Sequence, residues 1–256
     1  MNIAINVNDA YIPCAMVMLQ SLFENNPECS IVVHLLHASV SETELEKFRR
    51  YINSQNGELK VYTIDTAVFQ KFPDVGRWSV ETYFRLLLPE VMPVQIKKVL
   101  YLGADIIVNG SIKELYNMDF GKYCIIACPN MDCAVDAEER NKRWNRKGQL
   151  QYFNAGVMLL NLEKMRKRCS IEKYCSIIRK APDDFPMLDQ DLLNYVFGND
   201  VSYVPALKYN YIIAPNSELE EGSTIIYHFG TKDKPWQKMG AEKYYEIWWQ
   251  YARKLL

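Results

Sequence analysis

The segment KKVLYLGADIIV, residues 97–108, does most to decide the fold of this chain. Its apolar residues predict the strongest β-strand in the sequence, and the run is interrupted at Gly103-Ala104-Asp105 before it becomes apolar again. Burying a carboxylate such as that of Asp105 is unfavourable unless it is paired or binds a metal ion. Because ligands of open α/β sheets gather beyond the carboxyl ends of the strands, Asp105 is either a ligand-binding residue or an ordinary turn aspartate.

Upstream of this segment, apolar strands alternate with helical patterns. The residues predict strands at 2–7, 31–38 and 59–64 and helices at 13–25 and 41–51. Pro13 suits a first helical turn, and Ser41 with Glu44 forms a capping box that opens the second helix. Because the strands are apolar almost throughout, this β-α-β-α-β order indicates a mostly parallel sheet that is covered by helices on both faces.

The downstream part of the chain continues this alternation. It predicts helices at 79–88, from the end of the 153–162 strand to about 180, at 189–197 and at 241–256, and strands at 123–129, 153–162, 201–204 and 223–229. Residues 130–151 break the pattern because they are polar, charged and without periodicity, which predicts a long irregular insertion that is functional or mobile. No repeat or linker-like composition is present, so we expect residues 1–256 to form a single α/β domain.

Composition and charge exclude several classes of protein. Of the 256 residues, 49% are hydrophobic and 24% charged, which excludes bulk disorder. Thirty basic and 31 acidic residues give a net charge of −1, which argues against a nucleic-acid partner. No signal peptide or membrane-spanning run is visible, and seven cysteines, an odd number, predict reduced thiols in a cytoplasmic protein. Three of them lack the paired spacing of a zinc site and are predicted to be buried thiols: Cys124, Cys128 and Cys133.

Three further segments place polar groups beside buried elements. In IIYHFGTKDKPW, residues 225–236, His228 is a metal ligand or a hydrogen-bonded structural histidine, and Lys234 is able to meet a phosphate. In LDQDLLN, residues 188–194, acidic groups begin a helix, where the helix dipole favours them whatever the function. In FNAG, residues 153–156, small residues after Asn154 let a ligand approach the backbone. Two other histidines, His34 and His37, are predicted to be structural.

Together and in order, these motifs resemble those of the family 8 glycosyltransferases, which are retaining enzymes of the GT-A fold that use nucleotide sugars. The resemblance covers nearly the whole chain. It is carried by NDAY (8–11), SLFENN (21–26), ETYFRLLLPE (81–90), KVLYLGADIIV (98–108), YFNAGVMLLNL (152–162), LDQDLLN (188–194) and HFGTKDKPW (228–236). It implies a Rossmann-like, mostly parallel central sheet in one GT-A domain.

The resemblance also implies substrates and site residues. The donor would be UDP-glucose or UDP-galactose, and the acceptor a glycan or a lipid-linked saccharide. Asp189 and Gln190 would be the catalytic pair, and Asp105 with His228 would bind Mn²⁺ or Mg²⁺. The resemblance implies nucleotide-sugar contacts for Asn8, Asp9, Tyr11, Arg85, Gly103, Ala104, Asp105, Asn154, Ala155, Gly230 and Lys234, with Tyr11 stacked on the uracil.

The chemistry of retention bears on the role of Gln190. Glycosyl transfer passes through an oxocarbenium-like transition state while the departing diphosphate gains negative charge. A cation and a lysine neutralise that charge. Because a neutral amide is a poor nucleophile, we favour same-face attack guided by the leaving phosphate, with Gln190 supporting the positive charge. A trapped covalent sugar on Gln190 or Asp189 would refute this hypothesis.

Gly103 is the main departure from the family pattern, which normally carries Asp-x-Asp here. Mg²⁺ and Mn²⁺ sites often use only one or two carboxylates plus phosphate oxygens. Three readings therefore stay open: a weaker metal site, a metal-independent transferase that relies on Lys232 and Lys234, or a silent member that binds a nucleotide sugar or a glycan. A dinucleotide-dependent oxidoreductase is disfavoured because no GxGxxG loop follows the first strand. The glycine of HFGTKDKPW also comes one position early, so Gly230 or Thr231 would supply the diphosphate-binding amide.

Two segments bear on the acceptor. The basic stretch from Arg140 to Lys147, with Trp144, would close over the donor, bind an anionic glycan or form a solvated loop. The final helix, with Trp248 and Trp249, either packs on the sheet or makes a peripheral contact with the inner face of a membrane.

Overall fold

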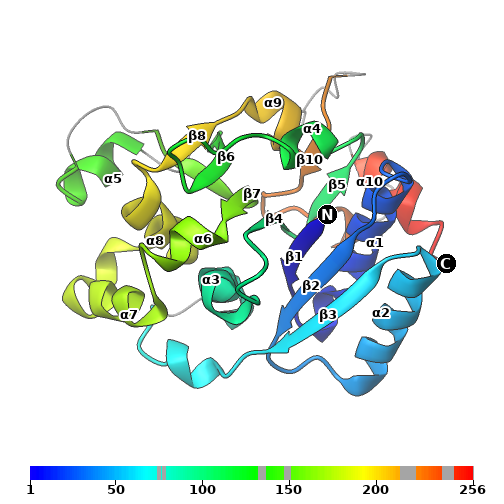
Figure 1. Cartoon of the computed structure of the whole chain (residues 1–256), viewed down its shortest axis with the longest axis horizontal. Helices are drawn as coiled ribbons and strands as arrows, with labels where there is room; N and C mark the ends of the chain where they lie inside the picture. Colours follow the sequence, from blue (N-terminus) through cyan, green and yellow to red (C-terminus); the bar gives the residue numbers. More distant parts are fainter. Residues whose placement is uncertain are drawn as a thin grey trace.

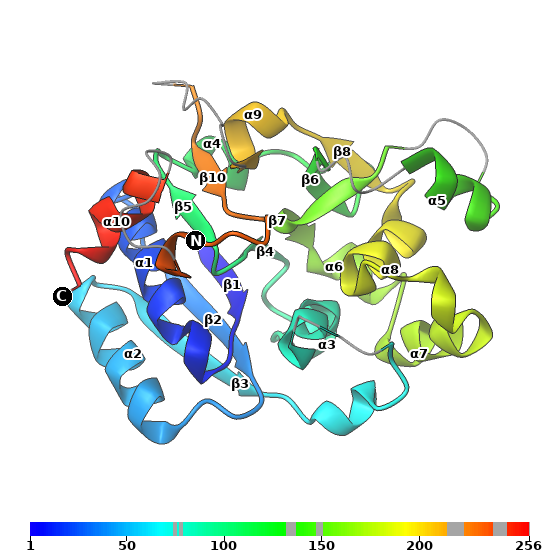
Figure 2. The same ribbon diagram turned by 180° about the vertical axis from the view of Figure 1, so that it is seen from behind.

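A seven-stranded sheet forms the centre of the computed structural model (Figures 1 and 2), which describes residues 1–73, 76, 79–131, 137–146, 151–213, 223–237 and 245–255. In spatial order its strands are β3 (Glu58–Thr63), β2 (Val32–His37), β1 (Asn2–Asn6), β4 (Lys98–Leu102), β7 (Phe153–Asn161), β6 (Ile125–Pro129) and β8 (Val201–Tyr203). β1 pairs in parallel with β2 and β4, whereas β7 runs antiparallel to both of its neighbours. The predicted α/β class with a mostly parallel sheet is confirmed.

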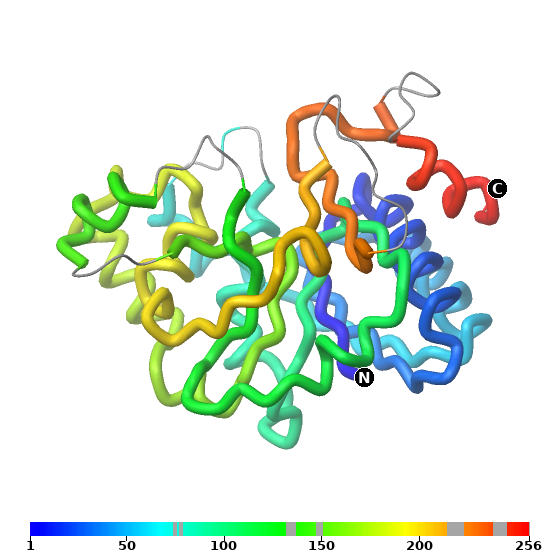
Figure 3. The backbone as a smooth tube through the Cα atoms, turned by 90° about the horizontal axis from the view of Figure 1, so that it is seen from above, coloured from blue at the N-terminus to red at the C-terminus, as the bar shows by residue number. Residues whose placement is uncertain are grey.

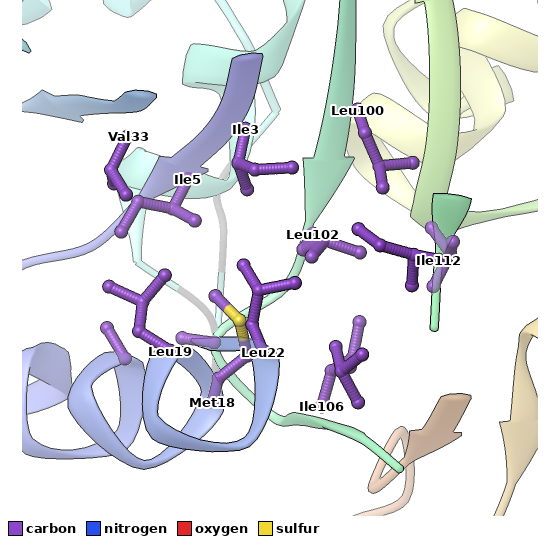
Figure 4. Packing of buried hydrophobic residues seen from close by; sticks show 14 of the residues in the cluster. Ile3, Ile5, Met18, Leu19, Leu22, Val33, Leu100, Leu102, Ile106 and Ile112 are labelled. Carbon is purple, nitrogen blue, oxygen red and sulfur yellow. The ribbon is translucent and has the colours of Figure 1, made fainter. Parts of the chain in front are cut away.

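Helices cover both faces of this sheet, as predicted. On one face lie α1 (Ile12–Glu24) and α2 (Glu42–Ser54), and on the other lie α3 (Leu88–Val91), α6 (Leu162–Arg166), α7 (Ile171–Lys180) and α8 (Leu188–Phe197). Successive residues of a strand point to opposite faces. Ile3 and Ile5 of β1 accordingly point toward α1 (Figure 4), whereas Ala4 between them joins the core on the other face.

Short helices complete the described part of the chain. These are α4 (Lys113–Tyr116), α5 (Ala137–Arg143), α9 (Ala206–Tyr209) and α10 (Glu246–Ala252), with 3₁₀ turns at Asp9–Tyr11, Thr66–Phe69, Val80–Leu87, Pro182–Asp184 and Pro235–Gln237. The predicted cap of α2 is present, because the Ser41 hydroxyl accepts the Glu44 N–H. Two predicted helices differ in detail: the one at 79–88 is a 3₁₀ turn that continues into α3, and the basic one is divided into α6 and α7.

The expected strand over residues 97–108 is in fact two strands in two sheets. After β4 the chain turns, and β5 (Ile106–Val108) pairs antiparallel with β10 (Ile226–His228), which also pairs with β9 (Tyr211–Ile212). At the turn, the Gly103 N–H bonds the Gly156 carbonyl, and the Asp105 carbonyl accepts the Phe229 N–H. The turn therefore joins the two sheets at the carboxyl end of β4, and it places Asp105 next to β10.

Part of the insertion at 130–151 is helical, which corrects the expectation of an irregular segment. α5 has no apolar stripe for a periodicity search to detect. It is supported by pairs one turn apart, Glu138 with Lys142 at 2.8 Å and Glu139 with Arg143 at 2.6 Å. Its acidic residues lie in the first turn and its basic residues in the last, as the helix dipole favours.

The C-terminal helix packs on the protein, so core packing is the alternative that the structure supports. α10 lies beside α1 (Figure 3), and Trp248 and Tyr251 are buried in a cluster with Val17 and Phe229. These two side chains are not available to a membrane. Among the residues that the structure describes, no helix is long and apolar enough to cross one.

The side chains predicted to be structural are buried. His34 contacts the Tyr62 hydroxyl at 2.9 Å and the Asn2 amide oxygen at 3.0 Å, and burial lowers its pKa to about 4. The ring nitrogen Nδ1 of His37 accepts a backbone N–H at 3.1 Å. Cys124 and Cys128 are buried free thiols, whereas Cys133 lies outside the described residues.

Candidate functional site

An open cleft of about 910 Å³ lies where the two sheets meet, beyond the carboxyl ends of β1 and β4. This is the position that ligands occupy in open α/β sheets. It brings together residues from six of the seven motifs, all except SLFENN. The predicted site residues that line the cleft are Asn8, Tyr11, Arg85, Gly103, Ala104, Asp105, Asn154, Ala155, Asp189, Gln190, His228, Gly230 and Lys234.

Asp9 is the predicted residue that does not line the cleft. Its carboxylate accepts the Ser41 N–H at 2.9 Å, which ties the first loop to the start of α2. Next to it, the Oδ1 atoms of Asn6 and Asn8 are buried acceptors without a hydrogen-bond partner in the described part of the chain. An unpaired buried acceptor is unfavourable. Both amides line the cleft, so a bound ligand with N–H or O–H donors would satisfy them.

Two positively charged or polar partners hold Asp105 at the centre of the cleft. Lys234 Nζ lies 2.7 Å from Oδ2, and His228 Nε2 lies 3.3 Å from Oδ1. Burial opposes ionisation of this carboxyl group, but Lys234 and His228 outweigh burial and hold its pKa well below the usual range. Asp105 is therefore held as a charged, paired carboxylate in the cleft and is not an unpaired turn aspartate.

A chain of amides sets the orientation of His228. The Gly156 N–H donates to Asn154 Oδ1 at 2.8 Å, and Asn210 Nδ2 donates to the same oxygen at 2.9 Å. Asn210 must then present its own oxygen to His228 Nδ1, 2.9 Å away. This network assigns a proton to Nδ1, and it leaves Nε2 facing Asp105 and the cleft.

Gly156 leaves room for this ring. A Cβ at that position would lie 2.4 Å from His228 Cε1, which is far inside contact distance. The glycine of the FNAG motif therefore makes space for the histidine. Asn210, which is 1% exposed, was not among the predicted residues. The signal that points to it is a polar residue inside the aromatic and apolar stretch KYNYII.

The donor atoms beside Gly103 fit a divalent cation with two protein ligands. Asp105 Oδ1 and His228 Nε2 are 3.3 Å apart, close to the roughly 3.0 Å between adjacent octahedral ligands at 2.1 Å from a metal. No third histidine, cysteine, aspartate or glutamate completes a cluster with them among the described residues. A Cβ at position 103 would lie 2.8 Å from Asp105 Oδ1, so Asp105 takes up space that a side chain there would need.

A second buried network holds the start of α8 against β7. Arg85 Nε lies 3.1 Å from Asp189 Oδ2, and Arg85 Nη1 donates to the Ala155 carbonyl at 2.7 Å. Thr82 donates its hydroxyl to the other Asp189 oxygen at 2.9 Å. Burial raises the pKa of Asp189, while Arg85 and Thr82 oppose that shift. Arg85 Nε donates its proton to the Thr82 carbonyl at 3.2 Å, so Asp189 Oδ2 is paired with Arg85 by charge and accepts no hydrogen bond in the described part of the chain. The ion pair holds Asp189 beside Arg85, which in turn holds the Ala155 carbonyl.

The amide of Gln190 lies at the cleft between β7 and α8. Its Oε1 accepts the Ala155 N–H at 2.9 Å, and its Nε2 donates to the Tyr152 hydroxyl at 3.3 Å. The amide oxygen keeps a second lone pair that is free of this network. These two hydrogen bonds hold the amide oxygen of Gln190, the negative end of the amide dipole, at the cleft that Asp105 and Lys234 also line.

Tyr11 and Trp236 stand at one side of the cleft. The Tyr11 ring is 38% exposed and meets Trp236 edge-on, with 5.9 Å between ring centroids. The Tyr11 side chain is therefore accessible from the cleft that it lines. Lys234 also approaches the Trp236 ring, 5.8 Å from its centroid.

The basic segment is attached to α8 and does not form a free loop. Arg140 pairs with Asp191, the Trp144 indole N–H donates to the Asp184 carbonyl at 3.2 Å, and Arg146 donates to the Asn194 carbonyl at 2.8 Å. Arg140 and Trp144 are buried. These side chains are thus engaged within the protein, which corrects the readings as a solvated loop or an anionic-glycan site for them. Lys147 lies outside the described residues.

Comparison with known proteins agrees with this geometry. The model of Glycosyl transferase family 8 matches residues 2–240. A lipopolysaccharide 1,2-glucosyltransferase of Escherichia coli is 28% identical, over 92% of this chain and 73% of its own. A lipopolysaccharide 1,3-galactosyltransferase of Salmonella typhimurium is 28% identical, over 94% of this chain and 74% of its own. The galactosyltransferase LgtC, solved with donor and acceptor sugar analogues, superposes with a TM-score of 0.86 and 25% identity, over 99% of this chain and 96% of that one.

Proposed function

Because the chain belongs to glycosyl transferase family 8, we propose that it is a retaining hexosyltransferase that moves glucose or galactose from a UDP-sugar to a glycan or lipid-linked saccharide. One observation carries the proposal. All but one of the predicted donor-site residues, from segments spread over more than 200 positions, line a single cleft around a charged Asp105. The lipopolysaccharide relatives favour a saccharide of that type as acceptor. The proposal places the protein in the cytoplasm.

The uridine would bind at the end of the cleft that β1 forms. Tyr11 offers an exposed ring for stacking on the uracil, and the unpaired oxygen of Asn8 would accept a donor from the nucleoside. Asp9 supports this loop through Ser41, so its role in binding would be indirect. The backbone of Ala104 would approach the ribose and diphosphate, because it follows Gly103 at the turn where the two sheets meet.

The diphosphate would lie between Asp105 and the loop after β10. Lys234, with Gly230 or Thr231, would contact its oxygens. Asp105 and the Nε2 atom of His228 would hold Mn²⁺ or Mg²⁺, and the ion would supply Lewis-acid stabilisation of the departing diphosphate. Lys234 supplies a fixed positive charge to the same leaving group, since its ammonium already faces the cleft beside Asp105.

The reactive carbon of the donor sugar would lie near Gln190. Positive charge develops there as the bond to the diphosphate breaks. The oxygen of the Gln190 amide stabilises that charge with its free lone pair, while the Ala155 N–H holds the amide in place. Arg85 positions the backbone of Ala155 and pairs with Asp189, so we assign Asp189 a positioning role beside Gln190. The acceptor would attack from the face of the leaving phosphate, which retains the configuration.

Gly103 keeps one alternative function in consideration. A chain with one carboxylate at this site is also consistent with a silent family member that binds a nucleotide sugar or glycan without transferring it. The silent member would differ from the proposed hexosyltransferase in one property, because it would bind the donor without turning it over.

Calorimetric titration of UDP in EDTA and in excess Mn²⁺ tests the proposal. We expect Mn²⁺ to strengthen UDP binding, and UDP-glucose or UDP-galactose to be hydrolysed slowly without acceptor. Equal binding in both buffers would indicate a metal-independent donor site built on Lys232 and Lys234. Binding without any hydrolysis or transfer would favour the silent member, and the absence of UDP binding would remove the donor site altogether.

A further inference from the structure

The helix of the 130–151 insertion, α5, connects to the reaction site through one buried ion pair. Arg140 is 8% exposed, and its Nε lies 3.1 Å from Asp191 Oδ1. Asp191 is completely buried and does not line the cleft. Burying such a pair is unfavourable unless its remaining hydrogen-bonding capacity is used. The other hydrogen bonds of Asp191 therefore indicate the role of the ion pair.

Asp191 accepts hydrogen bonds from three parts of the chain. Its Oδ2 accepts the Met187 N–H at 2.7 Å, and its Oδ1 accepts the Tyr152 hydroxyl at 2.8 Å in addition to the Arg140 contact. The first bond closes the turn before α8, where Leu188 has a φ of 53°, a conformation that residues other than glycine rarely adopt. Asp191 thus holds a strained turn directly before Asp189 and the reactive amide.

Tyr152 passes this constraint to Gln190. Its single hydroxyl proton is donated to Asp191, so the hydroxyl oxygen is left to act only as an acceptor toward Gln190 Nε2, 3.3 Å away. The Ala155 N–H donates to Gln190 Oε1 at 2.9 Å. One end of the amide meets an obligate acceptor and the other an obligate donor. Exchange of the amide oxygen and nitrogen would break both bonds.

We propose that Arg140, Asp191 and Tyr152 form a positioning relay that fixes the amide of Gln190 with its oxygen, not its nitrogen, available to the donor sugar. Tyr152 is the positioning residue that acts directly on Gln190, and Arg140 makes the relay depend on docking of α5. The relay rests on the proposed function, because it assigns a purpose to the Gln190 oxygen. Arg140, Asp191 and Tyr152 do not line the cleft themselves and act through Met187 and Gln190, which do.

Tyr152→Phe is the substitution that tests the relay, since it removes the hydroxyl and keeps the ring. Tyr203→Phe is the matched control, because its hydroxyl donates to the Gln151 carbonyl outside the cleft. We expect Tyr152→Phe to lower kcat roughly three- to tenfold, the value of about one neutral hydrogen bond, with KM for the donor and UDP affinity within about twofold of wild type. In a Gln190→Ala background, Tyr152→Phe should leave the residual rate unchanged.

A measurement on the amide itself separates this relay from the proposed function. The side-chain NH₂ resonances of Gln190 are identified by their absence from the spectrum of Gln190→Leu. We expect slow exchange of these protons with solvent in the wild type and in Tyr203→Phe, and faster exchange in Tyr152→Phe. That result supports the relay even if no UDP-hexose is turned over. Unchanged exchange in Tyr152→Phe, or an equal rate loss in the Gln190→Ala background, overturns it.

Discussion

Replacing Gly103 with aspartate tests how this site binds a cation. A Cβ at position 103 would lie 2.8 Å from Asp105 Oδ1, whereas its next neighbours, Ile106 Cδ1 and the Gly156 carbonyl, lie at 3.6 and 3.7 Å. The atom in the way is thus the end of the Asp105 side chain, which must shift slightly to admit the new group. We expect Gly103→Asp to fold, with its carboxylate beside that of Asp105.

The free energies of this substitution have opposite signs with and without metal. Two carboxylates about 4 Å apart repel by about 4 kcal/mol at an effective dielectric constant of 20. Lys234 pairs with Asp105 and offsets part of that repulsion, so we expect the metal-free variant to be about 1–2 kcal/mol less stable than wild type. A restored metal ligand should strengthen Mn²⁺ binding roughly 10- to 100-fold, which is about 1.4–2.7 kcal/mol.

Thermal unfolding and UDP calorimetry, each in EDTA and in Mn²⁺, measure both quantities. We expect Gly103→Asp to melt below wild type in EDTA and at or above it in Mn²⁺ with UDP. Gly103→Asn is the control, because it has almost the same shape without the charge and should show the loss without the gain. If Gly103→Asp and Gly103→Asn respond equally to Mn²⁺, a carboxylate at position 103 does not reach a metal ion beside Asp105 and the reasoning is refuted.

Three further substitutions follow from the same geometry. Lys234→Met should weaken UDP binding about tenfold by calorimetry, since it removes a charge-assisted contact to the diphosphate. In urea unfolding, the loss of stability of Lys234→Met relative to wild type should also narrow as pH falls from 7 to 3. The depressed pKa of Asp105 stabilises the folded wild type above the usual aspartate pKa of about 3.8, and that contribution is lost in acid. A loss of stability that does not change with pH would contradict the ion pair. Asn210→Leu removes the group that accepts the Nδ1 proton of His228. The strengthening of UDP binding by Mn²⁺ should therefore fall roughly 10- to 100-fold, while UDP affinity in EDTA is unchanged. A change of UDP affinity in EDTA alone would contradict this role. Gly156→Ala should destabilise the fold by about 1–3 kcal/mol in urea unfolding, because its Cβ would lie 2.4 Å from the His228 ring, and a neutral effect would mean that the ring is free to move.

The sequence by itself determined the sheet, the helices and the identity of the motif residues. Apolar strands and helices have periods that are visible within ten residues, so the alternation from β1 to β3 and the capped start of α2 are predictable. The ordered motifs also indicated the family correctly. The helix α5 was not predicted, because it is supported by charge pairs and has no apolar face whose period a search could detect.

Only the tertiary structure decided how these residues act on one another. Strand pairing between segments far apart in the sequence places His228 opposite Ile106 and brings Lys234 to Asp105 across 129 residues. It also divides residues 97–108 between two sheets. The orientation of a buried amide or imidazole depends on partners from several such segments, as with Asn210 and Tyr152. No local pattern encodes that choice, since it is set by satisfying every buried donor and acceptor together.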